Sequence, residues 1–240
     1  MKFFRYEMTD STNTRAREYA KLYGADEPSV FIAEGQSAGR GRRGRTFDSQ
    51  KGAGLYISFL FRPRGAAADA VRITAKAAVA LSRAIERVCG LSVGIKWVND
   101  IFADGKKLAG ILTEGEIDSE GGFRYAVCGI GVNLLSREFP DGLSDIVTTL
   151  EDCIGKKPDR EKLIEALTEE FFAERAEAEI MQEYRERSVV IGRRVNVRRI
   201  SGGSFSAFVI GITDDGALLV RTDGGGQEAL ISAEVSLSIE

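Results

Sequence analysis

Short apolar runs, each bounded by glycine, proline or polar residues, are the main pattern in the first half of the chain. Residues 29–33 and 55–61 are rich in β-branched and aromatic side chains, which is typical of strands. Between them, from Glu34 to Gly54, the apolar pattern stops. A connection of that length inside a compact domain is usually functional or disordered. We therefore expect two strands that flank a long functional loop.

Longer segments show the apolar periodicity of amphipathic helices. The expected helices cover residues 15–23, 69–89 and 144–154 and a long acidic stretch after Pro158, whose apolar stripe thins near residues 173–179 and allows a break there. Gly24 and Gly90 follow the first two segments as stop signals. These helices are expected to cover a sheet.

Residues 92–100, 107–117 and 123–135 have the composition of three strands joined by tight turns, which predicts an antiparallel meander. Its inner positions include Gly110, Gly129 and Gly131. Glycines clustered in strands indicate either bulges or a ligand that lies against the backbone. Both interpretations stay open from the sequence alone.

The pattern changes near Ser188. Four short segments then look like strands separated by glycine-containing turns, at residues 193–200, 204–212, 218–222 and 228–236. About fifty residues of closely spaced strands predict a small barrel-like β domain. We place the boundary near Arg187, which gives an expected domain 1–187 and a second domain 188–240.

Composition bounds the class of protein. The 240 residues are 43% hydrophobic and 29% charged, with net charge -3, as in an ordinary soluble globular protein. No apolar run approaches the ~20 residues of a membrane helix, and the first residues lack a signal-peptide core, so we expect a cytoplasmic location. The widely spaced Cys89, Cys128 and Cys153 are expected to be reduced thiols.

The chain contains no histidine. This excludes a Ser-His-Asp or Cys-His catalytic site and a histidine-bound metal. Catalysis would have to depend on positioning, on the charges of lysine and arginine, or on a hard cation held by oxygen atoms.

The segment from Gly39 to Arg45 holds four arginines and three glycines in seven residues. Arginine offers fixed cationic forks, and glycine lets backbone N–H groups approach an anion closely. The segment is therefore predicted to be an anion clamp that is mobile without ligand. The alternatives are a solvated basic loop or a nucleic-acid patch, although the acidic chain does not resemble a typical nucleic-acid binder.

Two further polar positions have a plain and a functional interpretation. The residues before the first helix, Asp10 to Asn13, suffice as an N-cap, and they would also suit a carboxylate or urea-like ligand. Lys107 starts an apolar run. Its side chain could point at water, as lysines commonly do, or into the cleft that the strand glycines open.

Taken together, five motifs in this order and spacing closely resemble the biotin protein ligases. They are Asp10-Ser11-Thr12-Asn13, Glu34 to Arg45, Lys96-Trp97-Val98-Asn99-Asp100, Lys107-Leu108-Ala109-Gly110-Ile111-Leu112 and Gly129-Ile130-Gly131-Val132-Asn133. The resemblance covers nearly the whole chain. It implies an α+β fold: a catalytic domain related to class II aminoacyl-tRNA synthetases, with a mixed, mainly antiparallel sheet, and a C-terminal SH3-like barrel.

The resemblance also implies the reaction. Biotin would attack the α-phosphate of ATP to give biotinyl-5′-AMP and pyrophosphate, and a lysine of a biotin carboxyl-carrier protein would then take the biotinyl group. Lys107, Arg42 and Arg40 would be the catalytic residues. Mg²⁺ would accompany ATP near Asn99 and Asp100, with its ligands left open.

The family motifs assign two sets of binding residues by resemblance. Those implied for biotin are Ser11, Thr12, Asn13, Gln36, Arg40, Gly41, Arg42, Lys107, Gly110, Gly129 and Gly131. Those implied for the nucleotide are Arg42, Arg45, Phe47, Asn99, Asp100, Lys107 and Asn133. Two positions depart from the family pattern. Val98 stands where proline is usual, and Phe47 stands where a tryptophan often stacks on adenine, although phenylalanine still offers an aromatic face.

Three alternatives compete with a biotin ligase: a lipoate ligase, whose usual signature ends in a histidine absent here, a nucleic-acid binder, and a biotin-binding module without ligase activity. Some family members carry an N-terminal DNA-binding domain and act as repressors. Only nine residues precede Asp10 here. We therefore expect a ligase that binds biotin, ATP and a carrier protein, without DNA or membrane, and the resemblance leaves a homodimer open.

Overall fold

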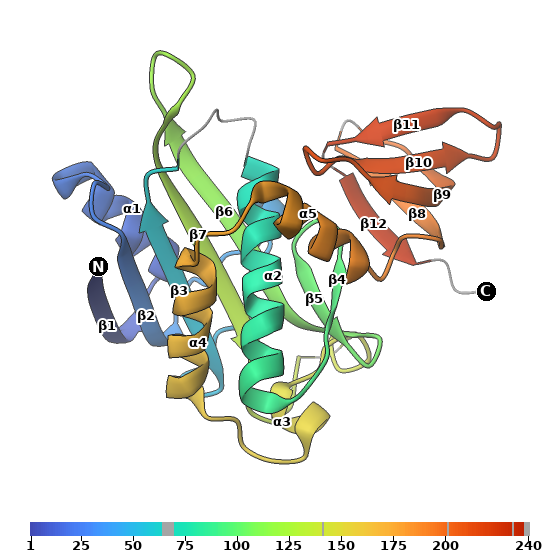
Figure 1. The fold of residues 1–240 in the computed structure, drawn as a ribbon. Coiled ribbons are helices and arrows are strands. Elements are labelled where there is room, and N and C mark those ends of the chain that lie inside the picture. Colours follow the sequence, from blue (N-terminus) through green and yellow to red (C-terminus); the bar gives the residue numbers. More distant parts are fainter. Residues whose placement is uncertain (64–69, 141, 201, 232, 238–240) are drawn as a thin grey trace.

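The computed structural model describes residues 1–63, 70–140, 142–200, 202–231 and 233–237. The described residues form one seven-stranded and one five-stranded sheet. Figure 1 shows helices packed across the larger sheet and the smaller sheet beside it. Within the described ranges, no helix is both long and apolar enough to cross a membrane.

The larger sheet is mixed but mainly antiparallel, as the resemblance implies. Its strands are β1 Lys2–Thr9, β2 Ser29–Gln36, β3 Gly54–Phe61, β4 Gly94–Lys96, β5 Asp100–Ala103, β6 Lys106–Ile117 and β7 Phe123–Asn133. The spatial order is β1-β2-β3-β7-β6-β5-β4. β1 and β2 pair in parallel, and the other neighbours pair antiparallel. The predicted meander therefore forms half of the sheet.

Successive side chains along each strand point to opposite faces of this sheet, and each face has its own apolar core. Val30 and Ile32 of β2 point to one face and pack with α2 (Ala70–Cys89), α4 (Arg160–Phe172) and α5 (Glu177–Glu186). Phe31 points to the other face and packs with α1 (Thr12–Tyr23). Figure 1 shows α2 and α4 side by side across the nearer face, with α1 behind the sheet. The α1 face is the one that carries the site.

The helix ends agree with the sequence predictions in part. α1 begins at Thr12, three residues before the expected start, and its N-cap Ser11 is extended but makes no side-chain capping hydrogen bond. Gly24 ends the helix as expected, with a φ of 75° that suits glycine. The acidic helix after Pro158 is indeed broken, because α4 ends at Phe172 and α5 begins at Glu177. The start of α2 at Asp69 lies outside the described residues.

Several sequence predictions differ from the structure in detail. The expected strand 92–100 is two short strands, β4 and β5, separated by a turn at residues 97–99. The expected helix 144–154 is α3, which covers only Leu150–Ile154. Residues 146–148 instead extend alongside β6, where Lys107 N donates to Ile146 O and Thr148 N donates to Lys107 O. Strand β1 was not predicted at all.

The C-terminal strands are β8 Arg194–Arg199, β9 Ser204–Ile212, β10 Leu218–Thr222, β11 Gln227–Leu230 and β12 Ala233–Leu237, in the spatial order β11-β10-β9-β8-β12. The single strand expected over residues 228–236 is therefore wrong. β11 and β12 are consecutive in the chain but form opposite edges of the sheet. Since so few residues join them, the sheet must curl until its edges approach, as in a small barrel.

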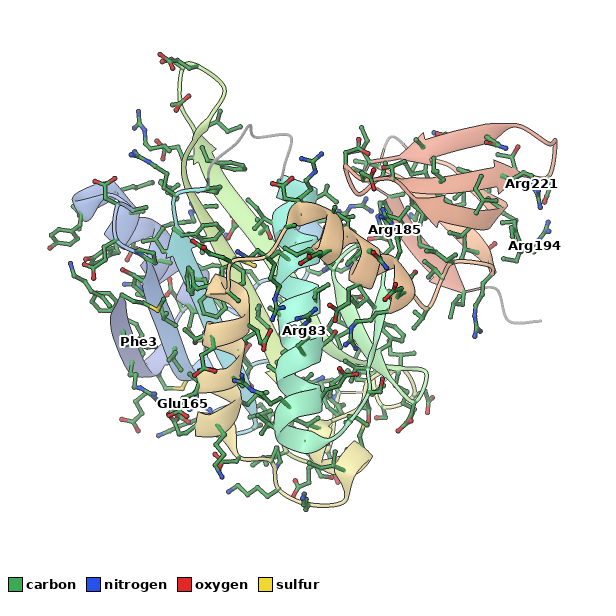
Figure 2. The ribbon with its side chains drawn as sticks, viewed as in Figure 1. Phe3, Arg83, Glu165, Arg185, Arg194 and Arg221 are labelled. Carbon is green, nitrogen blue, oxygen red and sulfur yellow. The ribbon has the colours of Figure 1, made fainter. Side chains whose placement is uncertain are left out.

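The two sheets are joined by specific contacts. The buried indole Nε1 of Trp97 donates to Gly216 O at 2.9 Å. Arg185, which Figure 2 shows on α5 beside the second sheet, donates to Asp214 at 2.9 Å. Beside this junction, Arg187 ties α2 to α5: it binds both oxygens of Glu86 and one of Glu183, and these bonds raise the pKa of its guanidinium. The junction is thus anchored at the end of α5.

Candidate active site

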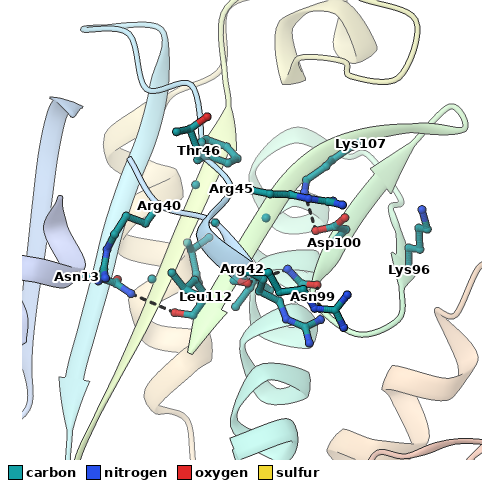
Figure 3. A pocket seen from close by; sticks show the side chains of 18 of the residues that line it. Asn13, Arg40, Arg42, Arg45, Thr46, Lys96, Asn99, Asp100, Lys107 and Leu112 are labelled. Atoms are coloured by element: carbon teal, nitrogen blue, oxygen red, sulfur yellow. Dashed lines mark hydrogen bonds and ion pairs between the residues drawn. The ribbon is translucent and has the colours of Figure 1, made fainter. Parts of the chain in front are cut away.

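A cavity lies on the α1 face of the large sheet, under the basic loop and next to β12. It is lined by every site residue that the sequence suggests except one: Ser11, Thr12, Asn13, Gln36, Arg40, Gly41, Arg42, Arg45, Phe47, Asn99, Asp100, Lys107, Gly110, Gly129 and Gly131. Figure 3 shows Asn13 and Arg40 at one side of this cavity and Asp100, Lys107 and Lys96 at the other. The cavity therefore has two ends.

One end carries hydroxyl and amide groups beside the ion pair of Arg40 and Glu114, and Asn13 Nδ2 donates to Glu114 Oε2 at 2.8 Å. Gln36 Oε1 accepts from Thr12 N at 2.8 Å and from Thr12 Oγ1 at 3.2 Å, while Gln36 Nε2 donates to Ser49 Oγ at 2.9 Å. The buried Ser58 Oγ lies 2.7 Å from Thr12 Oγ1 and 2.6 Å from Asn13 Oδ1. A hydroxyl has one proton, so it satisfies only one of these acceptors at a time. This end suits a neutral ligand that offers both donors and acceptors.

The strand glycines give side chains room to lie on the sheet. A Cβ at Gly129 would lie 2.0 Å from Asn13 Oδ1, and one at Gly131 would lie 2.6 Å from Phe47 Cε1. The β6–β7 register runs unbroken through Gly110, Gly129 and Gly131. Bulging is therefore not the reason for these glycines. They let Asn13 and Phe47 rest against the backbone and shape the cavity.

The other end is cationic. Lys107 Nζ donates to Asp100 Oδ1 at 2.7 Å, so its side chain turns into the cleft instead of toward water. Lys96 lines the same end, and burial lowers the pKa of its ammonium group, while the nearby Asp100 partly opposes that shift. Burial likewise lowers the pKa of Arg42. Partly buried cations at this end are suited to a multiply charged anion.

The basic loop is held over the cavity by protein partners. Arg40 Nη2 donates to Glu114 Oε2 at 2.5 Å, Arg42 Nη1 donates to Asn99 Oδ1 at 3.2 Å, and Arg43 and Arg45 pair with a carboxylate of β12. Among the described residues, the buried Nε of Arg40 has no hydrogen-bond partner. An unsatisfied buried donor on a cavity wall is a natural contact for a ligand acceptor.

Asn133 and Asn99 differ from their expected surroundings. Asn133 is buried outside the cavity lining, and its Nδ2 donates to Thr148 O at 3.2 Å. Asn99 lines the cavity, but its Nδ2 donates to Ile111 O at 2.9 Å while its Oδ1 accepts from Arg42. In this state Asn99 orients Arg42 and ties the turn at residues 97–99 to β6.

Several residues of the site were not predicted. They are Ser49, Ser58, Glu114, Lys96 and Glu234. The sequence does distinguish Ser58, because it is a polar residue within the apolar run of β3. Lys96 belongs to one of the five motifs, but the resemblance assigned it no role. Glu234 carried none. It reaches the loop only because the C-terminal sheet folds back onto the cavity.

The arrangement suits an elongated ligand with a neutral polar head and an anionic tail. It can bring two anions together and stabilise the charge that develops between them. Among the described residues there is no cluster of three or more potential metal-binding His, Cys, Asp or Glu side chains.

Two family models match the chain. The biotin/lipoate A/B protein ligase family matches residues 6–133, and the biotin protein ligase C terminal domain matches residues 190–238. Among curated relatives, the bifunctional ligase/repressor BirA of Bacillus subtilis (strain 168) is 34% identical over 240 residues, covering 97% of this chain and 73% of the relative. The biotin–[acetyl-CoA-carboxylase] ligase of Paracoccus denitrificans is 33% identical over 240 residues, covering 95% and 97%.

A solved structure agrees over the whole chain. The biotin protein ligase from Aquifex aeolicus in complex with biotin and ATP has a TM-score of 0.81 and 26% identity, and 99% of each chain is covered. This likeness confirms the expected α+β fold with a mixed sheet and a C-terminal antiparallel sheet, and the latter is consistent with the expected SH3-like barrel. By both family models and by these relatives, the chain belongs to the biotin/lipoate A/B protein ligase family and, within it, to the biotin protein ligases.

Proposed function

We propose that the cavity binds biotin and ATP side by side, joins them as biotinyl-5′-AMP, and passes the biotinyl group to a lysine of a carrier protein. The single observation that supports this most is the polarity of the cavity. Hydroxyl and amide groups converge at the Asn13 end, where the charge of Arg40 is paired with Glu114, and an excess of cations converges at the Lys107 end. Biotin has the same polarity, with a ureido ring at one end and a carboxylate at the other.

In the first step a biotin carboxylate oxygen attacks the α-phosphorus of ATP, and the bond to the bridging oxygen of pyrophosphate breaks. Both reactants are anionic, so the step needs cations at the point of contact. Lys107 takes this role, with Arg42 on the phosphate side and Arg40 closing over the biotin. Asp100 holds the Lys107 ammonium on the cavity wall before the substrates arrive.

The remaining roles follow from position. Ser11, Thr12, Asn13 and Gln36 would hold the ureido ring, over a floor that Gly129 and Gly131 leave open. Phe47 would stack on adenine from its place against Gly131. Asn133 would need a change of position to reach the nucleotide, because it lies outside the cavity lining.

Mg²⁺ would bind with the ATP phosphates and neutralise part of their charge. Asp100 is the cavity carboxylate suited to it, and Asn99 is the neighbouring amide. In the second step the ε-amine of the carrier lysine attacks the biotinyl carbonyl carbon, AMP leaves, and the amine gives up its proton to solvent.

We also propose the division into a catalytic domain 1–187 and a C-terminal domain 188–240. Support comes from the separate sheets and from the family match that begins at residue 190. The acceptor would be the carrier domain of a biotin-dependent carboxylase, since a relative is named for acetyl-CoA carboxylase. Some relatives are ligase/repressors, but the net charge of -3 does not favour DNA binding by these 240 residues.

Biotin-dependent exchange of pyrophosphate into ATP tests the first step directly. We expect exchange with biotin and none with lipoate. Exchange with lipoate alone would show that the substrate is lipoate and that the chain acts as a lipoate ligase, a class that belongs to the same matched family. Absence of exchange with either acid, in folded protein that binds biotin, would leave only a binding module. Light scattering of the same sample gives the oligomeric state.

A further inference from the structure

Glu234 comes from the last strand of the C-terminal sheet, yet it lines the cavity with its neighbours Ala233 and Val235. Its Oε1 forms ion pairs with Arg43 Nη1 at 3.2 Å and with Arg45 Nη2 at 2.6 Å. One carboxylate oxygen thus joins two arginines of the basic loop. This contact connects the two sheets at the mouth of the site.

The contact lies where the loop backbone is strained. Residues Arg42–Gly44 form a short 3-10 turn, within which Arg43 has φ 58° and ψ 38°. This left-handed conformation is unfavourable for a residue with a Cβ atom. Such strain persists only where surrounding contacts determine it. The ion pair with Glu234 is one such contact, and it acts on the strained residue itself.

The charges around Glu234 are unbalanced. Among the described residues that line this end of the cavity are five cations, Arg42, Arg43, Arg45, Lys96 and Lys107, and two carboxylates, Asp100 and Glu234. Two guanidinium groups held near one oxygen would repel each other without an anion between them. Glu234 supplies that anion, and the excess of positive charge remains for a ligand with several negative charges.

We propose that Glu234 is a positioning residue that keeps Arg43 and Arg45 assembled as a pair, so that their other N–H donors meet the β- and γ-phosphates of ATP. The proposal rests on the proposed function, in which ATP is a substrate. A guanidinium has five N–H donors, and the contacts with Glu234 engage one nitrogen of each arginine. Arginines ordered in advance bind phosphate more tightly, because less conformational entropy is lost on binding.

The test is calorimetric binding of Mg-ATP and of AMP to the full chain and to Glu234→Gln. Glutamine keeps the size of the side chain and removes its charge. We expect affinity for ATP to fall about 5- to 10-fold, the range for a partly exposed ion-pair network. Affinity for AMP, which lacks the β- and γ-phosphates, should change less than about twofold by the same arithmetic. Glu234→Asp, whose carboxylate is too short to reach both arginines, should show the same split.

Coupling through the arginines is tested in the Arg43→Gln/Arg45→Gln background, where Glu234→Gln should cause no further loss. Glu228→Gln is the matched control. Glu228 lies in the same sheet and also pairs with an arginine, Arg199, but it does not line the cavity. Its ATP affinity should equal that of the unaltered chain.

Tighter ATP binding by Glu234→Gln would overturn the proposal, because the carboxylate would then compete with the nucleotide. Equal losses for ATP and AMP, an equal loss in Glu228→Gln, or additive losses in the arginine background would overturn it as well. Pyrophosphate exchange by the unaltered chain is scored separately. A chain that shows the ATP-specific loss but no biotin-dependent exchange would contradict the proposed function and leave the role of Glu234 intact.

Discussion

The side chains of Lys107 on β6 and Asp100 on the paired strand β5 meet diagonally, with Lys107 Nζ 2.7 Å from Asp100 Oδ1, although the register places Gly110 opposite Asp100. The neighbouring Lys106 points the other way and donates to Ser144 O at the surface. Two consecutive lysines of one strand therefore lie in different surroundings, as the alternation of side chains requires. This pair provides a matched comparison for the proposed catalytic cation.

Lys107→Ala should impair adenylate formation without unfolding the protein. The proposed partners of Lys107 are the biotin carboxylate and the α-phosphate. Truncating one member of such a charge pair in the closed complex costs about 2–5 kcal/mol, which corresponds to about 30- to 5,000-fold in rate if the loss falls on the transition state. Pyrophosphate exchange and thermal melting measure the two effects. Lys106→Ala is the control and should retain normal exchange. Near-normal exchange in folded Lys107→Ala, or equal defects in both variants, would remove Lys107 from the site.

Gly129→Ala should weaken biotin binding. The added methyl group would lie 2.0 Å from Asn13 Oδ1, so Asn13 has to leave its place against the strand. Overpacking of this kind costs about 1–3 kcal/mol. Titration calorimetry with biotin measures the effect. Gly211→Ala is the control, because a Cβ there meets nothing within 4 Å. Unchanged biotin affinity in Gly129→Ala would show that Asn13 does not contact the ligand.

Hydrogen exchange in the loop from Gly35 to Gly54 should slow when biotin and ATP are added together. The loop is already tied by Arg40 to Glu114 and by Arg45 to Glu234, so partial protection is expected in the free protein. A bound anion adds contacts to the same arginines. Mass spectrometry of loop peptides, with peptides of α4 as an internal reference, gives the change. Identical exchange rates with and without ligands would contradict closure on the substrates.

Removal of residues 188–240 should impair ligation more than biotin binding. The contacts among Thr12, Asn13, Gln36 and Ser58 lie outside the removed segment. Trp97 would lose its acceptor at Gly216, and the melting temperature should fall. Calorimetry measures biotin binding, and pyrophosphate exchange measures adenylate formation. Both are carried out on protein whose folding is confirmed by circular dichroism. A folded truncated chain without biotin affinity would contradict the proposed division of roles.

Affinity for ATP should decline in mildly alkaline solution, before ordinary lysines titrate. Burial lowers the pKa of Lys96, so this ammonium loses its charge at a lower pH than an exposed lysine does. The cationic form binds phosphate, so affinity is retained below that pKa and falls above it. ATP binding is measured between pH 8 and pH 10, where ATP itself is fully ionised. Lys96→Arg should flatten the profile, and an unchanged slope in Lys96→Arg would exclude Lys96 as its source.

Much of the site was predictable because its chemistry is local. The cap residues before α1, the glycines of β7 and Lys107 at the start of β6 all follow from patterns within a few residues. The break at residues 97–99 could not be predicted in this way, because Trp97 and Val98 have strand-forming side chains. Strand propensity depends on context, and here the context produces a turn. Strand β1 was not predicted, because an edge strand is only half buried and its apolar pattern is weak. Phe4 and Tyr6 alternate with exposed residues there, which gives a weak signal.

Glu114 and Glu234 could not be predicted, because each finds its arginines only through long-range pairing. Glu114 accepts from Asn13 and Arg40, which lie far from it in sequence. Glu234 depends on the packing of one sheet against the other. A charged residue on a strand has no sequence feature that distinguishes such a contact from ordinary exposure to water.

Trp97 is the single tryptophan of the chain, and it stands where the cavity meets the second sheet. Its indole is buried, it lines the site, and its N–H depends on the carbonyl of Gly216. The protein therefore carries its own optical reporter at the junction. Intrinsic emission excited at the indole band follows ligand entry and any separation of the two sheets in unlabelled protein, without a background from other tryptophans.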